Sequence, residues 1–221
     1  MARSGLAEDN IFAALDADPS RPHRQLSKTM IDEDLILVDE RNRAVGTAPK
    51  QHVHRAGLLH RAFSIFLIDS QGRLLLQQRH PRKYHSGGLW ANSCCGHPKD
   101  RERTMQAAHR RLGEELGLDA TLRFGFFSRY QTALDNGMHE NEFVYVFFGA
   151  IADPVRPNAD EIINVDFLTP REIRRRVRQE PSSFTYWLKY YFRMHDAEIS
   201  RLSAQPTQDS IGQSSGLPLC T

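Results

Sequence analysis

The sequence is poor in cysteine and in long apolar runs, and each shortage argues against a class of protein. Of its three cysteines, Cys94 and Cys95 are adjacent and Cys220 is next to the last residue. We therefore expect no disulfide framework, and we expect the protein to reside in a reducing compartment. No apolar stretch of signal-peptide length opens the chain, and no window approaches the roughly 20 apolar residues of a membrane span. We therefore expect a soluble cytoplasmic protein with no membrane partner.

Net charge is also scarce. The formal charge of the 221 residues is only +2, which is too small to imply the basic face that nucleic-acid binding requires. Nucleic acid is therefore not an expected partner, whereas a small anionic ligand is compatible with this balance. With 40% hydrophobic and 25% charged residues, the chain can bury a core without disulfide support. We expect it to be a monomer.

Composition divides the chain into three parts. Residues 1–29 carry Asp, Pro, Arg and Ser with only a short apolar patch around Ile11 and Phe12, which predicts a loosely ordered N-terminal arm. Residues 201–221 have the composition of a disordered C-terminal tail. Residues 30–200 are left as one catalytic domain.

Apolar periodicity within this domain predicts strands in the middle and helices around them. Strands are expected at 34–39, 62–68, 73–79 and 142–148. Helices are expected at about 102–116, 169–179 and 181–194. The strand at 142–148 is apolar on both alternating faces, so it should be covered on each side. A central sheet between helices is an α/β sandwich.

The first of these helices is rich in carboxylates and lies between two glycines. The segment runs Gly96-x5-Glu102-x7-Arg110-Arg111-Leu112-x-Glu114-Glu115-x-Gly117-Leu118. Glu115 lies about two turns beyond Ala108 of the apolar stripe, whereas Glu114 points outward, one turn after Arg110. We predict that Glu115 binds a divalent cation bridged to phosphate oxygens, and that Glu114 pairs with Arg110 or is a secondary ligand. The alternative for the Glu-Glu pair is an ordinary salt-bridged helix surface, which the full spacing disfavours.

Two more carboxylates head the predicted central strand. Glu140 and Glu142 are two residues apart, so both share the face of the apolar residues that follow. Buried carboxylates are costly unless they bind a proton, a cation or a hydrogen-bond donor.

Four histidines lie before the first hairpin and after the cysteine pair: His52, His54, His60 and His97. Imidazoles with carboxylates are typical of zinc or other transition-metal sites, although a lone histidine is more often structural or exposed.

Cys95 lies in a loop between Trp90 and the start of the carboxylate-rich helix. Neighbouring cations or the helix N-terminus could lower its pKa there. A thiol can also donate a proton while it is neutral. This setting favours covalent or proton-transfer chemistry at Cys95, whereas Cys94 is better explained as a small buried hydrophobe.

Positive side chains near the hairpin and the helix could bind a diphosphate: Lys50, Arg79, Lys83 and Arg111.

Taken together, these motifs resemble the type I isopentenyl-diphosphate isomerases, a branch of the Nudix fold. The matching residues are Lys50, His54, His60-Arg61-Ala62-Phe63-Ser64, Gln78-Arg79, Lys83-Tyr84-His85, Trp90, Asn92-Ser93-Cys94-Cys95-Gly96-His97-Pro98 and Glu140-Asn141-Glu142. They follow one another in the family's order over about residues 32–195. The resemblance implies a Nudix-like α/β/α sandwich with a central mixed β-sheet.

The resemblance also implies a reaction in isoprenoid biosynthesis. Isopentenyl diphosphate would become dimethylallyl diphosphate by protonation of the alkene and deprotonation on the opposite face, through a tertiary carbocation. Cys95 and Glu142 would be the two opposed groups, with Tyr130 assisting Glu142 and the π-face of Trp187 stabilising the cation. Mg²⁺ would accompany the diphosphate, bound by Glu115. A further divalent metal, Mn²⁺, Zn²⁺ or Mg²⁺, would be held by His54, His60, His97, Glu140 and Glu142.

Two other functions are left open by the sequence. A Nudix-type pyrophosphohydrolase would cleave the diphosphate, but Arg111 stands where hydrolases of that superfamily carry a magnesium-binding glutamate. A non-catalytic metal-binding interaction module would leave Cys95 and Glu142 without a role. The sequence also does not decide which of these two residues donates the proton.

Overall fold

The computed structural model describes residues 33–134 and 136–204. The arm predicted at 1–29 and the tail beyond Ala204 lie outside the described residues. The last described helix, α5 (Asp196–Ser203), continues three residues past the domain end predicted at 200, and its Leu202 is buried in the core. Within the described ranges, no helix is both long and apolar enough to cross a membrane.

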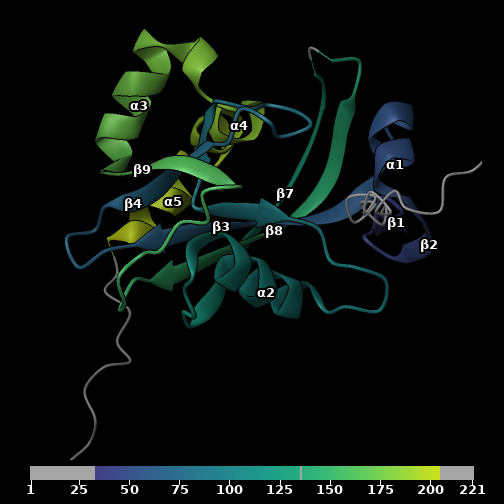
Figure 1. The fold of residues 1–221 in the computed structure, drawn as a ribbon, viewed down its shortest axis with the longest axis horizontal. Helices are drawn as coiled ribbons and strands as arrows, with labels where there is room; N and C mark the ends of the chain where they lie inside the picture. The colour runs from purple at the N-terminus through teal and green to yellow at the C-terminus, as the bar shows by residue number, and fades with distance from the viewer. Residues whose placement is uncertain (1–32, 135, 205–221) are drawn as a thin grey trace, which may run out of the picture. The chain divides into compact units, whose positions relative to one another are not determined.

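Strands and helices alternate along the described chain (Figure 1). The strands are β1 (Asp34–Val38), β2 (Ala44–Pro49), β3 (His60–Ile68), β4 (Leu74–Arg79), β5 (Trp90–Asn92), β6 (Cys94–Gly96), β7 (Leu122–Ala133), β8 (His139–Ala150) and β9 (Ile162–Leu168). The helices are α1 (Lys50–Ala56), α2 (Thr104–Leu116), α3 (Pro170–Gln179), the 3₁₀ helix η1 (Pro181–Ser183), α4 (Tyr186–Met194) and α5. The predicted α/β class is confirmed.

Strand β3 lies at the centre of a mixed nine-stranded sheet. It pairs in parallel with β8, from His60 opposite Glu142 to Ile68 opposite Ala150. It also pairs antiparallel with β1, β4 and β6, while β7 extends the sheet beyond β8, and β5 and β9 both pair with β4. The parallel register brings the predicted ligands His60 and Glu142 side by side, although they are far apart in the sequence.

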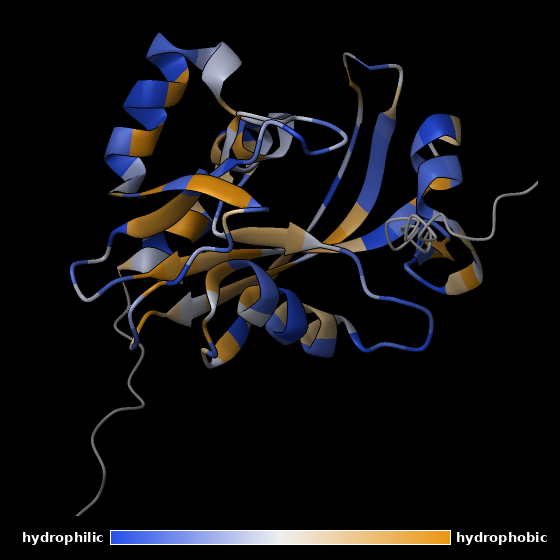
Figure 2. Cartoon of the chain, in the orientation of Figure 1, coloured by the Kyte–Doolittle hydropathy of each residue, from blue (hydrophilic) through white to orange (hydrophobic). Residues whose placement is uncertain are grey.

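The side chains of β3 and β8 alternate between two faces, and helices cover each of these faces. Figure 1 shows α2 on one side of the central strands and α3 and α4 on the other. Even-numbered residues of β3 and β8, such as Phe66 and Phe148, pack with α4 and α5. Phe63 and Phe147, odd-numbered residues of the same strands, pack with α2. Figure 2 shows the central strands as largely hydrophobic and α3 as largely hydrophilic.

Two predicted helices differ from the observed ones at their starts. Helix α2 begins at Thr104 rather than at Glu102, because the Glu102 carboxylate accepts a hydrogen bond from the Lys99 amide and closes a turn before the helix. The helix expected at 181–194 is divided into η1 and α4. The break lies at Phe184 and Thr185, where the Thr185 amide donates to the Trp90 carbonyl and its side chain caps α4. Helix α3 follows Thr169, which forms a capping box with Glu172, and so begins close to the predicted residue 169.

Candidate active site

Three imidazoles and two carboxylates meet where β3 and β8 begin. One ligand atom from each residue lies within 4.8 Å of the others, and the residues are His54, His60, His97, Glu140 and Glu142. Helix α1 carries His54, the segment after β6 carries His97, and the rest come from the two paired strands. The structure thus brings together the five residues that the resemblance grouped as metal ligands.

His52, which its place in the sequence grouped with the other histidines, lies outside this cluster. His52 is exposed, whereas His54 is fully buried. Both belong to α1, and side chains two positions apart on a helix point in nearly opposite directions. Grouping His52 with His54 by proximity in the sequence is therefore wrong, because the intervening backbone is helical.

The imidazole rings are held with one nitrogen turned away from the cluster. Nδ1 of His54 lies 2.8 Å from the Lys50 carbonyl oxygen and Nδ1 of His60 lies 2.9 Å from that of Leu58. A carbonyl oxygen can only accept, so each Nδ1 carries a proton, and each Nε2 is turned into the cluster, where its lone pair can bind a cation. Nε2 of His60 is 3.2 Å from Nε2 of His97, which in turn is 2.9 Å from Glu142 Oε1. Such a convergence of electron pairs is the arrangement that a cation stabilises.

The charges of the cluster follow from its burial. Burial raises the pKa of Glu140, and the nearby charge of Glu142 raises it further. Burial alone would also raise the pKa of Glu142, but hydrogen bonds with His60 and His97 hold it well below its usual range. Burial lowers the pKa of His97 to about 3. In addition, Glu140 Oε2 is buried and accepts no hydrogen bond from any described residue, so the site has an unused oxygen acceptor.

His85 also contacts this cluster, from outside it. Its Nε2 lies 3.2 Å from Glu140 Oε1, and its side chain is only 6% exposed. Burial lowers the pKa of His85 to about 2, with a further contribution from the charge of Arg79. The sequence offered one signal for this residue, its place in the quoted motif Lys83-Tyr84-His85, but histidine type and spacing alone did not assign it a role.

The two adjacent cysteines point to opposite faces of the sheet, as neighbours on a strand do. Cys94 is fully buried in the core beside α2, which matches its expected role as a small hydrophobe. Cys95 packs on the α4 side. Its thiol donates to Asn92 Oδ1 over 3.1 Å and lies 3.4 Å from Ser64 Oγ.

The expectation that cations or the helix N-terminus lower the pKa of Cys95 is wrong. Burial raises this pKa to about 12, although the hydrogen bond with Ser64 and the charge of Arg79 act in the opposite direction. Helix α2 begins only at Thr104, and a helix dipole acts only within its first turn. The thiol is therefore protonated at neutral pH.

Tyr130 and Trp187 share the same side of the sheet as Cys95. Tyr130 lies on β7 directly opposite Glu142, and its hydroxyl donates to Glu142 Oε2 over 2.5 Å. Burial, together with the charge of Glu142, raises the pKa of Tyr130 well above its usual value. The Trp187 ring lies under the guanidinium of Arg79, at 5.3 Å from its centroid.

The four basic residues predicted to bind a diphosphate lie close enough together for their charges to shift the pKa values of the two lysines. The pKa of Lys83 is lowered to about 8, mainly by burial and also by the charges of Arg79, Arg111 and Lys50, against an opposing effect of Glu115. The pKa of Lys50 is lowered in the same way, first by burial and then by Arg111 and Arg79. Arg79 Nε is buried and donates to no described residue. This concentration of positive charge with an unused donor is suited to an anion.

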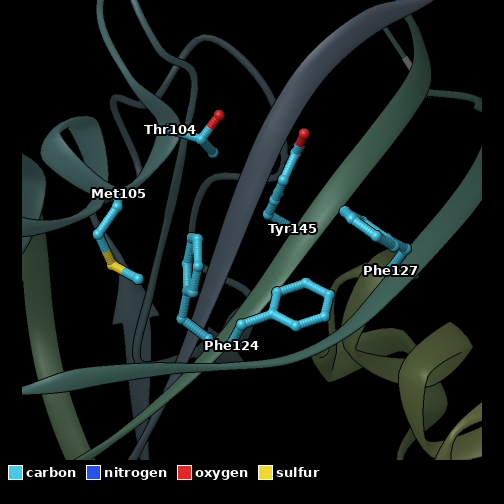
Figure 3. A pocket seen from close by; sticks show the side chains of 6 residues that line it. Thr104, Met105, Phe124, Phe127 and Tyr145 are labelled. Carbon is cyan, nitrogen blue, oxygen red and sulfur yellow. The ribbon is translucent and has the colours of Figure 1, made fainter.

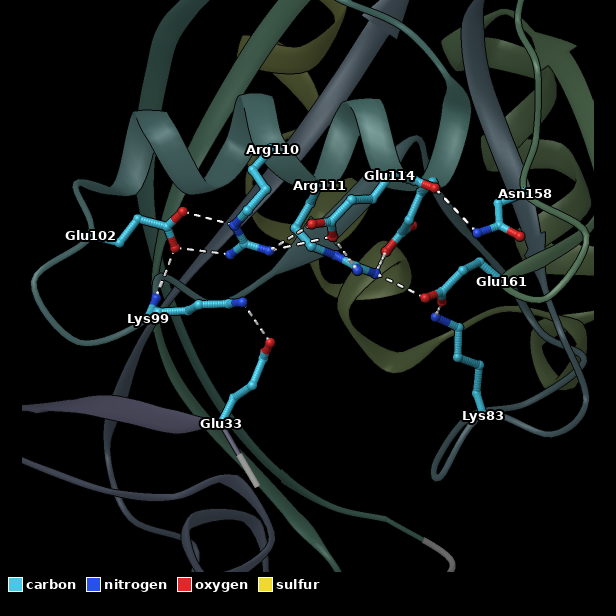
Figure 4. Close-up of polar contacts among 10 residues, drawn as sticks. Glu33, Lys83, Lys99, Glu102, Arg110, Arg111, Glu114, Asn158 and Glu161 are labelled. Atoms are coloured by element: carbon cyan, nitrogen blue, oxygen red, sulfur yellow. Dashed lines mark hydrogen bonds and ion pairs between the residues drawn. The ribbon is translucent and has the colours of Figure 1, made fainter. Parts of the chain in front are cut away.

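The Glu-Glu pair of α2 is divided as predicted, but with one unexpected partner (Figure 4). Glu114 is exposed and pairs with Arg110 and Arg111 at 3.3 and 2.7 Å. Glu115 is buried, and its two oxygens accept from Arg111 Nη2 and, over 3.0 Å, from Gln77 Nε2. Arg111 also lies 3.4 Å from Glu161, which pairs with Lys83. A guanidinium therefore lies beside Glu115, where the sequence predicted a metal ion.

A separate open groove of about 350 Å³ is found on the α2 face (Figure 3). It is lined by Thr104, Met105, Phe124, Phe127, Tyr145 and Phe147. Phe124 and Phe127 are each about half exposed, and the lining contains neither carboxylate nor imidazole. The buried polar cluster on the other face is thus the candidate for chemistry.

Comparison with known proteins gives matches over the same region. Residues 58–188 match the NUDIX domain family. The isopentenyl-diphosphate Delta-isomerase of Pectobacterium atrosepticum is 44% identical over 159 residues, which cover 72% of this chain and 89% of that protein. The protein of the same name from Burkholderia multivorans is 46% identical over 157 residues, covering 71% and 89%.

Solved structures support the fold. A protein from Deinococcus radiodurans is similar with a TM-score of 0.61 at 20% identity, over 74% of this chain and 99% of that one. A MutT protein from Methanosarcina mazei is similar with a TM-score of 0.53 at 16% identity, over 66% and 96%. At these identities the likeness concerns architecture alone.

Proposed function

The chain belongs to the isopentenyl-diphosphate Delta-isomerase family of the Nudix fold, and from this premise we propose how its buried residues divide the reaction. It is an isomerase that interconverts isopentenyl diphosphate and dimethylallyl diphosphate. The observation that carries the site assignment is the arrangement around Glu142. This carboxylate accepts from Tyr130 and contacts His97, on the same face of the sheet as the thiol of Cys95.

The reaction exchanges one proton for another. A proton adds to the terminal alkene carbon, whose π electrons form the new C–H bond and leave a tertiary cation. A base then removes a proton from the neighbouring methylene, and that C–H pair becomes the new double bond. One proton enters, one leaves, and no bond of the diphosphate breaks. A protonated thiol at Cys95 and an ionised carboxylate at Glu142 form a pair that can give one proton and take another in each turnover, after which proton exchange with solvent restores both groups.

The orientation of the Cys95 thiol is set by its neighbours. Both amide hydrogens of Asn92 are used, since Nδ2 donates to the carbonyls of Ile65 and Cys94. The Asn92 carbonyl oxygen is therefore fixed toward the thiol. On the other side, Ser64 Oγ lies 2.8 Å from the Tyr191 hydroxyl, so a chain of hydroxyl groups ends at sulfur. These donors would stabilise the sulfur when its proton has been lost.

Stabilisation of the cation would fall to aromatic and apolar surroundings. Cys95, Tyr130 and Trp187 lie in or against one hydrophobic cluster, which excludes the water that would otherwise capture a carbocation. An aromatic face attracts a cation through the ring quadrupole. Trp187 already has the Arg79 guanidinium over its ring, which supports its role as a surface for positive charge.

The five-residue cluster fits a divalent cation. Two imidazole nitrogens 3.2 Å apart face one another, and a buried carboxylate oxygen of Glu140 has no hydrogen-bond donor among the described residues. A mixed nitrogen and oxygen set is compatible with Mn²⁺, Zn²⁺ or Mg²⁺. When bound, such an ion supplies positive charge that keeps the carboxylates ionised. His54, His60, His97, Glu140 and Glu142 would hold it.

A second cation, Mg²⁺ with the diphosphate, is proposed at Glu115. Here the fit depends on Arg111, because its guanidinium now supplies the positive charge beside that carboxylate. Binding of the magnesium diphosphate would replace Arg111 at Glu115 and free Arg111 for phosphate oxygens. Lys50, Arg79 and Lys83 would complete the anion site, and the unused Arg79 Nε would gain an acceptor.

A single incubation distinguishes this function from hydrolysis. In deuterated water, isopentenyl diphosphate should give dimethylallyl diphosphate with deuterium in a methyl group and no release of phosphate or pyrophosphate. Cys95→Ala and Glu142→Gln should each slow conversion by about 10²–10⁴-fold while the variants stay folded by circular dichroism. Release of phosphate without an allylic product would contradict the assignment, and near-normal conversion by either variant would refute its residue roles.

Cellular setting and assembly are proposed from composition. We expect a monomer in the cytoplasm, where the two described cysteines stay reduced. Sedimentation equilibrium should give the mass of one 25.3 kDa chain. A dimer mass at micromolar concentration would contradict this expectation.

A further inference from the structure

We propose that His85 is a positioning residue of the metal centre, holding Glu140 in the orientation that presents its second oxygen to the ion. This inference rests on the proposed metal centre and adds to it a residue outside the five ligands. His85 Nε2 lies 3.2 Å from Glu140 Oε1. The other oxygen, Oε2, lies 3.5 Å from the ligand nitrogen of His54 and accepts no hydrogen bond from the described part of the chain. The two oxygens of this carboxylate therefore have different tasks.

The hydrogen-bond partners of His85 determine which of its two ring nitrogens carries the proton. Nδ1 lies 3.3 Å from Ser86 Oγ, whose hydroxyl can donate to it. In the metal-loaded centre Glu140 is ionised and its oxygens can only accept, so Nε2 of His85, which faces Oε1, carries the proton there. An imidazole N–H that donates to a ligand carboxylate orients that ligand, and loss of such a partner typically weakens metal binding about 10- to 100-fold.

His85 is fixed in place by the loop that carries it. The loop between β4 and β5 is closed at its base by two backbone hydrogen bonds, Arg79 to Leu89 and Gly88 to Arg79, each 3.0 Å long. Gly87 packs so closely that an added Cβ would lie 2.4 Å from the Pro81 carbonyl oxygen. On the other side of His85, the Asn136 side chain donates a hydrogen bond to the carbonyl oxygen of Tyr84, the preceding residue, over 2.7 Å. His85 is thus held toward Glu140 by main-chain contacts on both sides.

His85 also joins the metal centre to the diphosphate side. Its carbonyl oxygen accepts from Arg79 Nη2 over 3.3 Å, and its ring meets the Trp187 ring edge-on, with centroids 5.9 Å apart. Arg79 lies over the face of that same tryptophan. A single residue therefore contacts a proposed metal ligand, a proposed diphosphate ligand and the proposed cation-stabilising ring.

The test measures metal affinity directly. Wild type and variants are loaded with Zn²⁺, and the dissociation constant is obtained by competition with a chromophoric chelator, without any assay of turnover. His85→Leu should bind Zn²⁺ about 10- to 100-fold more weakly. His85→Gln places an amide N–H near the position of Nε2 and should stay within about threefold of wild type. The matched control is His52→Leu, which removes an exposed imidazole close to His54 and should leave the affinity unchanged.

Three results would overturn the inference. One is a wild-type Zn²⁺ affinity in His85→Leu while His60→Ala loses the metal, which would leave the metal centre intact and His85 without its role. Another is a His85→Gln variant as weak as His85→Leu although both zinc-free proteins unfold at the wild-type temperature, since the donor would then not matter. The last is an unchanged affinity in His60→Ala, which would refute the five-residue centre itself.

Discussion

Tyr130→Phe is the most direct probe of the proposed acid–base pair, because it removes one oxygen atom and preserves the ring. The lost interaction is the 2.5 Å hydrogen bond to Glu142. Hydrogen bonds to charged groups contribute roughly 1.5–3 kcal/mol, and about 1.4 kcal/mol corresponds to a tenfold change in rate. If this bond acts in the transition state, kcat should fall by about 10- to 150-fold. The packing of the ring against Tyr186, Tyr190 and Tyr191 should be preserved.

The assay follows formation of dimethylallyl diphosphate at saturating isopentenyl diphosphate, together with deuterium incorporation from deuterated water. Tyr190→Phe is the matched control, since the Tyr190 hydroxyl donates only to the Arg129 carbonyl in an exposed position. The control should keep kcat within about twofold, because surface changes are energetically small. The reasoning is refuted if Tyr130→Phe turns over as fast as the control, or if its loss appears only in KM.

Further predictions concern charge, the thiol and packing. Lys83, with a pKa of about 8, binds phosphate oxygens only when protonated, so kcat/KM should be constant below pH 8 and fall above it; Lys83→Arg should remove that decline, and an unchanged pH profile would contradict it. Because burial raises the pKa of Cys95 to about 12, iodoacetamide should alkylate it at pH 7.5 far more slowly than a free thiol; rapid, inactivating alkylation would show a thiolate. Cys95→Ala should lower kcat by about 10²–10⁴-fold, whereas Cys94→Ala should mainly lower the free energy of unfolding; equal kcat losses would argue against the different roles. Gly125→Ala would place a Cβ 2.5 Å from a core phenylalanine ring and should reduce the free energy of unfolding in urea by about 1–3 kcal/mol. Gly113→Ala lies within α2, and its added Cβ would come no closer than 3.9 Å to a described atom outside the helix's own backbone and its chain neighbours, so it should not reduce that free energy; equal effects would refute the packing argument.

Sequence patterns predicted the helices and strands whose own residues show a regular spacing of apolar side chains. Helix α2 has its apolar stripe buried through Ala108, Leu112 and Leu116, and α3 spans Pro170–Gln179, close to the predicted 169–179. Strands β2, β5, β6, β7 and β9 were not predicted. Two of them, β5 and β6, are three residues long, and so short a run has no periodicity of its own and depends on pairing with β4 and β3.

The same distinction applies to the site. The order of motifs predicted which side chains to consider, and Glu114 and Glu115 were assigned their exposed and buried sides from helix geometry alone. The contacts of Cys95 with Ser64 and Asn92 were not predicted, because they depend on the register between strands that are distant in the sequence.

By itself, then, the amino-acid order determined the family, the reaction and the chemical types gathered for it, since these follow from residue identity and spacing. Only the tertiary structure decided that Cys95 keeps its proton, that Arg111 occupies the place beside Glu115, and that His85 supports Glu140. Each of these depends on how far a side chain is removed from water and which distant charge it meets there. Burial and long-range contact are properties of the packed chain and are not encoded in any short segment of it.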